Sequence, residues 1–119
     1  NKVNIKEIRL DFANIIKIDS NSFDSFINLD MLSLYWNTIL TINEDLFQNL
    51  TSLKILRLNK NKLYHLKDRS FSGLFNLKEL YLSDNEIESF EQNAFSYLSN
   101  LEILDLKNNK IKQLNNIDI

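Results

Sequence analysis

Residues 53–76, LKILRLNKNKLYHLKDRSFSGLFN, contain the pattern that decides the fold. Apolar residues and one asparagine stand at fixed places in this stretch, namely Leu53, Leu56, Leu58, Asn61, Leu63, Leu66, Phe71 and Leu74. The same pattern recurs without a gap in units that begin every 24 residues, at Ile5, Leu29, Leu53, Leu77 and Leu101. The last unit is incomplete, and it keeps the pattern through Leu114, with Ile119 at the place of the phenylalanine. In-phase copies of this kind predict structural units that stack on one another.

The spacing inside a unit predicts one short strand followed by a return segment. Leu56 and Leu58 alternate with Arg57, as in a strand that has one face in the core, so the leucines should point inward and Arg57 outward. Stacked units would align these strands in a parallel sheet with a spacing of about 4.8 Å. We expect that sheet to form the concave wall of the molecule.

Two further columns of the repeat predict contacts between units. An asparagine at unit position 9 should turn inward and bond to backbone groups of neighbouring coils, which predicts a ladder of Asn37, Asn61, Asn85 and Asn109. Ala13 takes this place in the first unit and cannot make these bonds, so we expect the ladder to be interrupted or water-filled there. An aromatic at unit position 19 should fill the convex half of each coil, giving a spine of Phe23, Phe47, Phe71 and Phe95.

These motifs resemble the leucine-rich repeat family, and the resemblance covers residues 5–119. The 24-residue unit with its phenylalanine is similar to the extracellular-type repeats of Toll-like receptor, Slit and mosquito immune ectodomains. The resemblance implies an α/β solenoid: a right-handed superhelix with short parallel strands on its concave face and irregular or 3-10 turns on its convex face. We interpret residues 1–119 as one leucine-rich repeat domain and, because neither end resembles a cap, as a fragment of a longer protein.

Composition argues against several other classes of protein. Lys plus Arg number 14 and Asp plus Glu 16, so there is no basic field for nucleic acid. No apolar run approaches the roughly 18 residues of a membrane span, so we expect no membrane insertion in this segment. With no cysteine and with Gly73 as the only glycine, disulfides, thiolate metal sites and glycine-rich phosphate loops are all excluded. The nearby carboxylates Asp84, Glu86 and Glu88 lack the spacing of a calcium loop. We therefore predict no metal and no cofactor.

The sequence also predicts that the chain is not an enzyme. Its single histidine, His65, should lie on a solvated loop just before Leu66. No serine stands in a glycine-bounded turn, and no pocket for a catalytic triad is expected in this fold.

The variable positions of the strand segments, numbers 3, 5, 7 and 8 of each unit, should line the concave wall. Trp36 should lie beside Phe12 and Tyr35, and Arg57 beside Tyr81, where a cation-π contact is possible. Tryptophan, tyrosine and arginine are enriched at binding hot spots. We predict a ligand-binding set of Arg9, Phe12, Tyr35, Trp36, Arg57 and Tyr81. The alternative is that Phe12 and Trp36 only shield the edge of the core.

The resemblance implies a non-catalytic module that binds a protein or peptide on its concave face, in extracellular innate immune sensing or cell-surface adhesion. The alternative is an intracellular or pathogen-derived scaffold or adaptor with a cytoplasmic location, which the absence of cysteine favours. A purely structural spacer is disfavoured by the aromatic cluster. Uncapped ends could also pair two copies as a homodimer. The sequon Asn49-Leu50-Thr51 carries no weight, because a chain so rich in asparagine is expected to contain sequons by chance.

Overall fold

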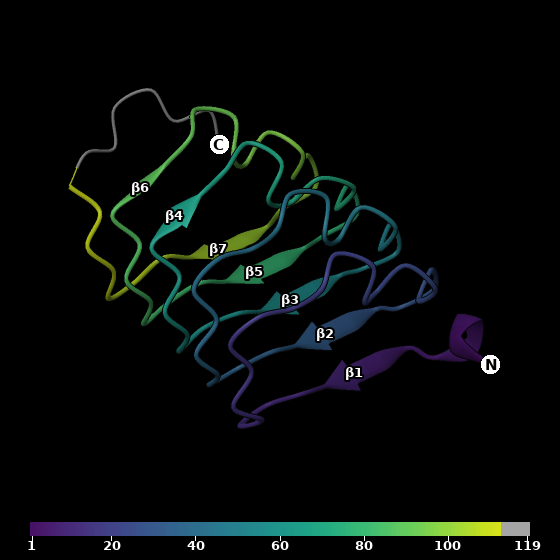
Figure 1. The fold of residues 1–119 in the computed structure, drawn as a ribbon. Helices are drawn as coiled ribbons and strands as arrows, with labels where there is room; N and C mark the ends of the chain where they lie inside the picture. Colours follow the sequence, from purple (N-terminus) through teal and green to yellow (C-terminus); the bar gives the residue numbers. More distant parts are fainter. Residues whose placement is uncertain (113–119) are drawn as a thin grey trace.

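Five short parallel strands, one from each unit, lie side by side along one wall of the molecule in the computed structural model, which describes residues 1–112 (Figure 1). The strands are β1 (Glu7–Arg9), β2 (Met31–Ser33), β3 (Ile55–Arg57), β5 (Glu79–Tyr81) and β7 (Ile103–Asp105), in the order β1-β2-β3-β5-β7. Each residue pairs with the residue 24 positions further on, as Ile8 does with Leu32 and Leu56 with Leu80. The predicted parallel-strand solenoid is therefore confirmed, with its period set by the repeat. The expected anchors Leu114 and Ile119 lie outside the described residues.

A second, smaller sheet was not predicted. β4 (His65–Leu66) pairs with β6 (Ser89–Phe90) in parallel, on the returning part of the third and fourth coils (Figure 1). The expectation that His65 lies on a solvated loop was wrong, because its main chain belongs to β4 and its side chain is half-buried. Neighbouring coils come close enough at this point for backbone pairing, which the apolar pattern alone does not reveal.

The repeated apolar anchors form one continuous core between the strands and the returning segments. Leu56 and Leu58 have no exposed surface, as the alternation within the strand predicts. Each coil returns through turns with bonds from residue i+3 back to residue i, such as Leu74 N–H to Phe71 C=O at 3.3 Å. At the first coil the anchors are more open, and Ile5 and Leu10 each keep 37% of their surface exposed.

The rest of the described chain contains little helix. A short 3-10 helix, η1 (Lys2–Asn4), precedes the first strand. Within residues 1–112, no helix has both the length and the apolar character needed to cross a bilayer.

The phenylalanines at unit position 19 are buried and contact one another in pairs. Phe23 packs on Phe47 with ring centroids 6.0 Å apart, and Phe71 stacks on Phe95 at 6.1 Å with nearly parallel rings. Their exposed fractions are all 5% or less, so these rings fill the interior behind the returning turns.

The asparagines at unit position 9 bond backward to the preceding coil. Asn85 donates to the C=O of Leu58 at 3.0 Å and of Leu82 at 3.1 Å, and its Oδ1 accepts from the N–H of Leu63 at 3.0 Å. Each therefore joins its own coil to the coil before it, and the same arrangement recurs at Asn37, Asn61 and Asn109.

Ala13 contributes no side-chain bond, so the ladder begins at Asn37, but the backbone of the first coil is still paired. The N–H groups of Ala13 and Ile15 both donate to Asn37 Oδ1 at 3.0 Å. The backbone of the first coil is served by the asparagine of the second, so the alanine leaves none of these groups without a partner.

A second column of asparagines, at unit position 24, joins the coils on the side where the strands begin. Asn28 donates to the C=O of Val3 at 2.9 Å, Asn76 to that of Thr51 at 2.7 Å, and Asn100 to that of Phe75 at 2.6 Å. In each case the acceptor lies 25 residues before the asparagine, in the preceding coil. Ser52 takes this position at the boundary between the second and third coils.

Candidate ligand-binding surface

An aromatic cluster lies where the first two strands of the main sheet end. Phe12 follows β1, and Tyr35 and Trp36 follow β2. The Phe12 ring lies 5.5 Å from Tyr35, edge to face, and 5.3 Å from Trp36, and the rings of Tyr35 and Trp36 are 5.9 Å apart. These separations are those of favourable aromatic contacts. The cluster therefore presents a preassembled aromatic surface at the end of the sheet.

Backbone geometry explains why these rings project outward. The residue at unit position 8 has a positive φ in every coil: 54° at Phe12, 56° at Trp36, 58° at Lys60, 57° at Asp84 and 57° at Asn108. This left-handed conformation turns the chain out of the strand, and non-glycine residues adopt it at a cost. Phe12 and Trp36 keep 64% and 49% of their surface exposed at this turn.

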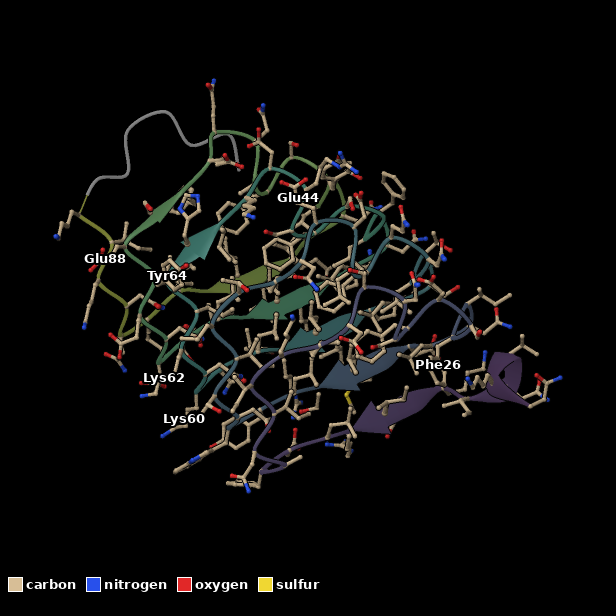
Figure 2. All side chains as sticks on the ribbon, in the orientation of Figure 1. Phe26, Glu44, Lys60, Lys62, Tyr64 and Glu88 are labelled. Carbon is tan, nitrogen blue, oxygen red and sulfur yellow. The ribbon has the colours of Figure 1, made fainter. Side chains whose placement is uncertain are left out.

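Lys60, which the sequence analysis did not include in the site, extends the cluster toward the third coil. Its Nζ lies 4.6 Å from the centroid of the Trp36 ring, within the range of a cation-π contact. Figure 2 shows Lys60 and Lys62 on the side where the strands end, whereas Phe26 lies toward the side where they begin. The ring face of Trp36 is thus partly covered by a cationic side chain.

A polar hollow of about 380 Å³ opens beside the aromatic cluster, over the middle strands. It is lined by Asp11, Ser33, Tyr35, Arg57, Asn59 and Tyr81. Tyr35 belongs to both features, so the hollow and the aromatic cluster form one continuous surface.

One wall of the hollow is fixed by hydrogen bonds between coils. Asp11 accepts from the hydroxyl of Ser33 at 2.5 Å and from the N–H of Tyr35 at 3.0 Å. These bonds hold the start of the second turn in place and leave Asp11 largely engaged.

Two of the residues that line the hollow each have one buried polar atom without a partner. Arg57 Nε and Asn59 Oδ1 have no hydrogen-bond partner among the described residues. Arg57 also forms no ion pair within residues 1–112. Buried polar groups are ordinarily paired, so these two atoms distinguish the hollow from the rest of the surface.

The other wall is Tyr81, which is tied to two charged residues. Its hydroxyl donates to Glu79 at 2.5 Å, and the Arg57 guanidinium lies 5.8 Å from its ring centroid. The hydrogen bond to Glu79 raises the pKa of the Tyr81 phenol above its ordinary value, and burial and the charges of Glu79 and Asp105 raise it further, against an opposing effect of Arg57. At neutral pH this wall is therefore a neutral phenol held by a carboxylate.

The structure brings five of the six predicted site residues together and leaves one apart. Phe12, Tyr35 and Trp36 form the cluster, while Arg57 and Tyr81 line the hollow. Arg9 does not line the hollow; its Nε lies 3.7 Å from Glu7 on the same strand, at the edge of the sheet.

Sequence reasoning missed Asp11, Ser33, Asn59 and Lys60 because it weighted aromatic and arginine side chains. All four stand in the variable columns of the repeat, so their general location was available from the spacing. Which of them bond to one another, and which stay unpaired, depends on rotamers that spacing does not determine.

Other polar groups outside this surface are engaged in contacts. His65 Nδ1 lies 2.7 Å from Ser89 Oγ across the small sheet, and no third residue bonds to this pair in the described chain. Glu86 pairs with Lys110, which lowers the pKa of the Glu86 carboxyl. Asp84 accepts from Asn108 Nδ2 at 3.0 Å.

Comparison with known proteins identifies the repeat. Residues 3–63 and 51–111 match the family model described as leucine rich repeat. No curated protein matches the chain significantly.

Several solved structures are similar to the chain. In a TLR13–ssRNA13 complex the matching chain is 42% identical with a TM-score of 0.88, over 92% of this chain and 15% of that one. The leucine-rich repeat domain of APL1B is 27% identical with a TM-score of 0.87, over 92% and 32%. In the Drosophila Toll–Spatzle complex the values are 30% and 0.77, over 81% and 13%. The chain thus spans less than a third of the length of each of these structures.

Proposed function

This chain belongs to the leucine-rich repeat family, and from that premise we propose that it is a non-catalytic module that binds a protein or peptide ligand on the concave face of its main sheet. The similar Toll structure is a complex with the protein Spatzle, a hub of development and innate immunity. We accordingly propose an extracellular or cell-surface setting, in innate immune sensing or adhesion. Fold alone does not determine function, so the argument depends on the surface itself.

The observation that carries the proposal is the exposed aromatic cluster next to the polar hollow. Phe12 and Trp36 pack on one another and still leave about half or more of their surface in solvent. Large, rigid rings that bury area at a small cost in conformational entropy are typical of protein interfaces. The adjoining hollow, which is lined by Asp11, Ser33, Arg57 and Asn59 besides two tyrosines, adds polar groups that an apolar patch lacks.

A protein ligand fits the charge of this face better than RNA, the ligand in the similar TLR13 complex. Four carboxylates stand on or directly after the strands, at Glu7, Asp11, Glu79 and Asp105. Two arginines, Arg9 and Arg57, are on the same strands, Lys60 and Lys107 follow β3 and β7, and Arg9 is already beside Glu7. A phosphate backbone is bound by clustered lysine and arginine, and on this face the cations alternate with carboxylates and form no such cluster.

The test is selection of peptides from a random library on the immobilised chain, followed by calorimetric measurement of the dissociation constant. Trp36→Ala and Tyr81→Ala should each weaken the selected peptides by about 10-fold or more, the effect of losing an interface hot spot. Tyr64→Ala is the matched control, because Tyr64 is an aromatic residue with 50% exposure beside the small sheet (Figure 2). It should change the dissociation constant less than 2-fold.

Two results would contradict the proposal. One is an equal loss of affinity in Tyr64→Ala and Trp36→Ala, which would place the binding surface elsewhere. The other is tighter binding of a labelled single-stranded RNA than of any selected peptide in 150 mM salt, measured by fluorescence anisotropy. Circular dichroism of every variant checks that the fold persists.

A further inference from the structure

We infer that a second hollow, on the side of the molecule where the strands end, is a subsite for one acidic side chain of a peptide ligand, with the ammonium groups of Lys60 and Lys62 holding its carboxylate beside Trp36. This inference rests on the proposed binding of a protein or peptide and specifies the charge of one residue of that ligand. The acidic residue is an aspartate or a glutamate.

The second hollow, called here the lysine hollow, has a volume of about 340 Å³, which is enough for one side chain. Its lining includes Asn14, Trp36, Thr38, Lys60, Lys62 and Asp84. Trp36 lines the lysine hollow and Tyr35 lines the polar hollow over the strands, so the aromatic cluster borders both. A ligand that covers the aromatic cluster can therefore also reach the two lysines.

The main chain that carries the two lysines is tied to the coils on both sides. The N–H of Lys60 donates to the C=O of Ser83 in the next coil, and the N–H of Lys62 donates to that of Ile39 in the coil before, both at 2.9 Å. Between the lysines, the buried side chain of Asn61 is engaged in the ladder at unit position 9. Binding would thus order mainly the lysine side chains, which both project on this side of the molecule (Figure 2).

Neither Lys60 nor Lys62 forms an ion pair within residues 1–112. The two carboxylates that follow on the next coil have other partners, because Asp84 accepts from an asparagine amide of the last coil at 3.0 Å and Glu86 pairs with Lys110. The pKa of the Glu86 carboxyl is lowered mainly by Lys110 and to a smaller extent by Lys62. A ligand carboxylate would therefore meet two ammonium groups without displacing an existing ion pair.

Trp36 provides an apolar surface next to this charge. Its indole ring is 49% exposed, and Lys60 Nζ lies 4.6 Å from the ring centroid. A carboxylate bound to that ammonium group is close enough to the ring for the methylene groups behind it to pack on the indole. The ring and the cations together match an acidic side chain, which has apolar methylenes and a charged end.

The lysine pair is confined to one coil, which favours a single acidic side chain over a nucleic acid. In the columns at unit positions 8 and 10, the coil before has Trp36 and Thr38, and the coil after has Asp84 and Glu86. A phosphate backbone that followed these columns would leave the lysines and meet carboxylates. One aspartate or glutamate side chain needs only the coil that carries the lysines.

The experiment uses the indole N–H signal of Trp36 in a ¹⁵N-correlated NMR spectrum of the whole chain. Trp36 is the only tryptophan, so this signal reports on the lysine hollow without further assignment. The probes are the methylamides of N-acetylglutamate and N-acetylglutamine, which differ in side-chain charge, together with inorganic phosphate and octauridylate RNA. Circular dichroism checks the fold of each variant.

The glutamate probe should shift the Trp36 signal saturably, with a dissociation constant in the millimolar range, and the glutamine probe should not. Raising the salt from about 50 to about 500 mM should weaken the glutamate probe, because screening reduces the attraction of the lysines.

Lys60→Gln and Lys62→Gln should each weaken the glutamate probe about 3-fold or more, since each removes one charge-assisted contact. Lys54→Gln is the matched control. It removes the same charge from the same coil, but Lys54 directly precedes β3, on the side where the strands begin. It should change the dissociation constant less than about 2-fold.

The inference is overturned if the glutamate probe gives no saturable shift, if the glutamine probe binds as tightly, or if Lys54→Gln weakens binding as much as Lys60→Gln and Lys62→Gln do. Tighter binding of phosphate or octauridylate than of the glutamate probe would also overturn it, by assigning the hollow to a phosphate group. These outcomes are separate from the peptide selection. Selected peptides that depend on Trp36 while the glutamate probe fails to bind would leave the proposed function standing and remove only this subsite.

Discussion

The single glycine of the chain lies directly against the backbone of the preceding coil. Gly73 has a φ of +87°, and a Cβ built on it would stand 2.2 Å from the backbone oxygen of Gln48 in the preceding coil. Neither the left-handed conformation nor the contact with rigid backbone tolerates a side chain.

Gly73→Ala should therefore lower the free energy of unfolding by about 2–5 kcal/mol, combining left-handed strain with overpacking. Ser25→Ala is the matched control, since Ser25 holds the same unit position in the first coil and is exposed. It should stay within about 0.5 kcal/mol. Urea denaturation followed by circular dichroism measures both, and an alanine at residue 73 that costs no more than the one at residue 25 would contradict the close approach.

The titration of Tyr81 tests the wall of the hollow at the scale of one group. Its folded-state pKa is raised, first by the hydrogen bond to Glu79, so the neutral phenol is favoured in the fold. The associated stabilisation is present below the ordinary tyrosine pKa of about 10 and is lost as pH rises through the raised value.

The absorbance difference at 295 nm between the original chain and Tyr81→Phe should show Tyr81 ionising above pH 10. Glu79→Gln should move this ionisation to lower pH, because the charged acceptor is gone. Glu102 is the control, because its carboxylate pairs with Lys78 at 3.7 Å. Glu102→Gln should leave the pH of Tyr81 ionisation unchanged. Ionisation of Tyr81 at or below the pH of free tyrosine would show that the bond to Glu79 does not form in solution.

At the scale of the repeated element, the column at unit position 24 has a serine, Ser52, where the other units have an asparagine. Asn28, Asn76 and Asn100 each donate to the preceding coil, and Ser52 stands in their place at the remaining boundary. By the spacing of the other three bonds, an asparagine at residue 52 would donate to the C=O of Ile27.

Ser52→Asn should add this missing bond and raise the free energy of unfolding by about 0.5–1.5 kcal/mol. Asn76→Ser is the reciprocal change and should lower it by a similar amount. The urea midpoint at an unchanged m-value measures both. If Asn76→Ser has no effect, the column does not stabilise the stack.

The asparagine ladder at unit position 9 should cost more to break in the middle than at its last rung. Asn85 is 5% exposed, and its loss leaves the N–H of Leu63 buried without a partner, while the C=O groups of Leu58 and Leu82 each keep one donor, from Asn61 and Asn109; Asn85→Ala should therefore destabilise by about 2–3 kcal/mol. Asn109 makes the same bonds in a partly exposed setting, where water can replace them. Asn109→Ala should cost about 1 kcal/mol, and equal losses in the two variants would contradict this account.

For the molecule as a whole, the architecture could be predicted from the sequence because one spacing determines it. A constant 24-residue interval places Leu32, Leu56 and Leu80 in register and leaves no freedom in the order of the strands. The small sheet of β4 and β6 escaped prediction, because it depends on how closely the returning segments of two coils approach. The apolar pattern of the repeat does not indicate where two returning segments come close enough to pair.

The candidate site could be predicted only in part, for a different reason. Spacing gives the column of each exposed residue, so the neighbourhood of Phe12, Tyr35 and Trp36 followed from arithmetic. Which side chains pair with one another is a separate matter. Arg9 pairs with Glu7 and Asp11 with Ser33, whereas Arg57 Nε and Asn59 Oδ1 have no partner among the described residues. Those choices are settled by side-chain geometry and not by position in the repeat.

Because the asparagine side chains bond to the preceding coil, they imply an order in which the coils are completed. Each amide completes the hydrogen bonding of the coil made before it, as Asn61 does for the N–H of Ile39 at 3.1 Å. During synthesis from the amino end, a newly emerging coil would thus seal its predecessor, whose own backbone groups had until then been open to water. Growth along the chain and closure of the interior would proceed together, one turn at a time.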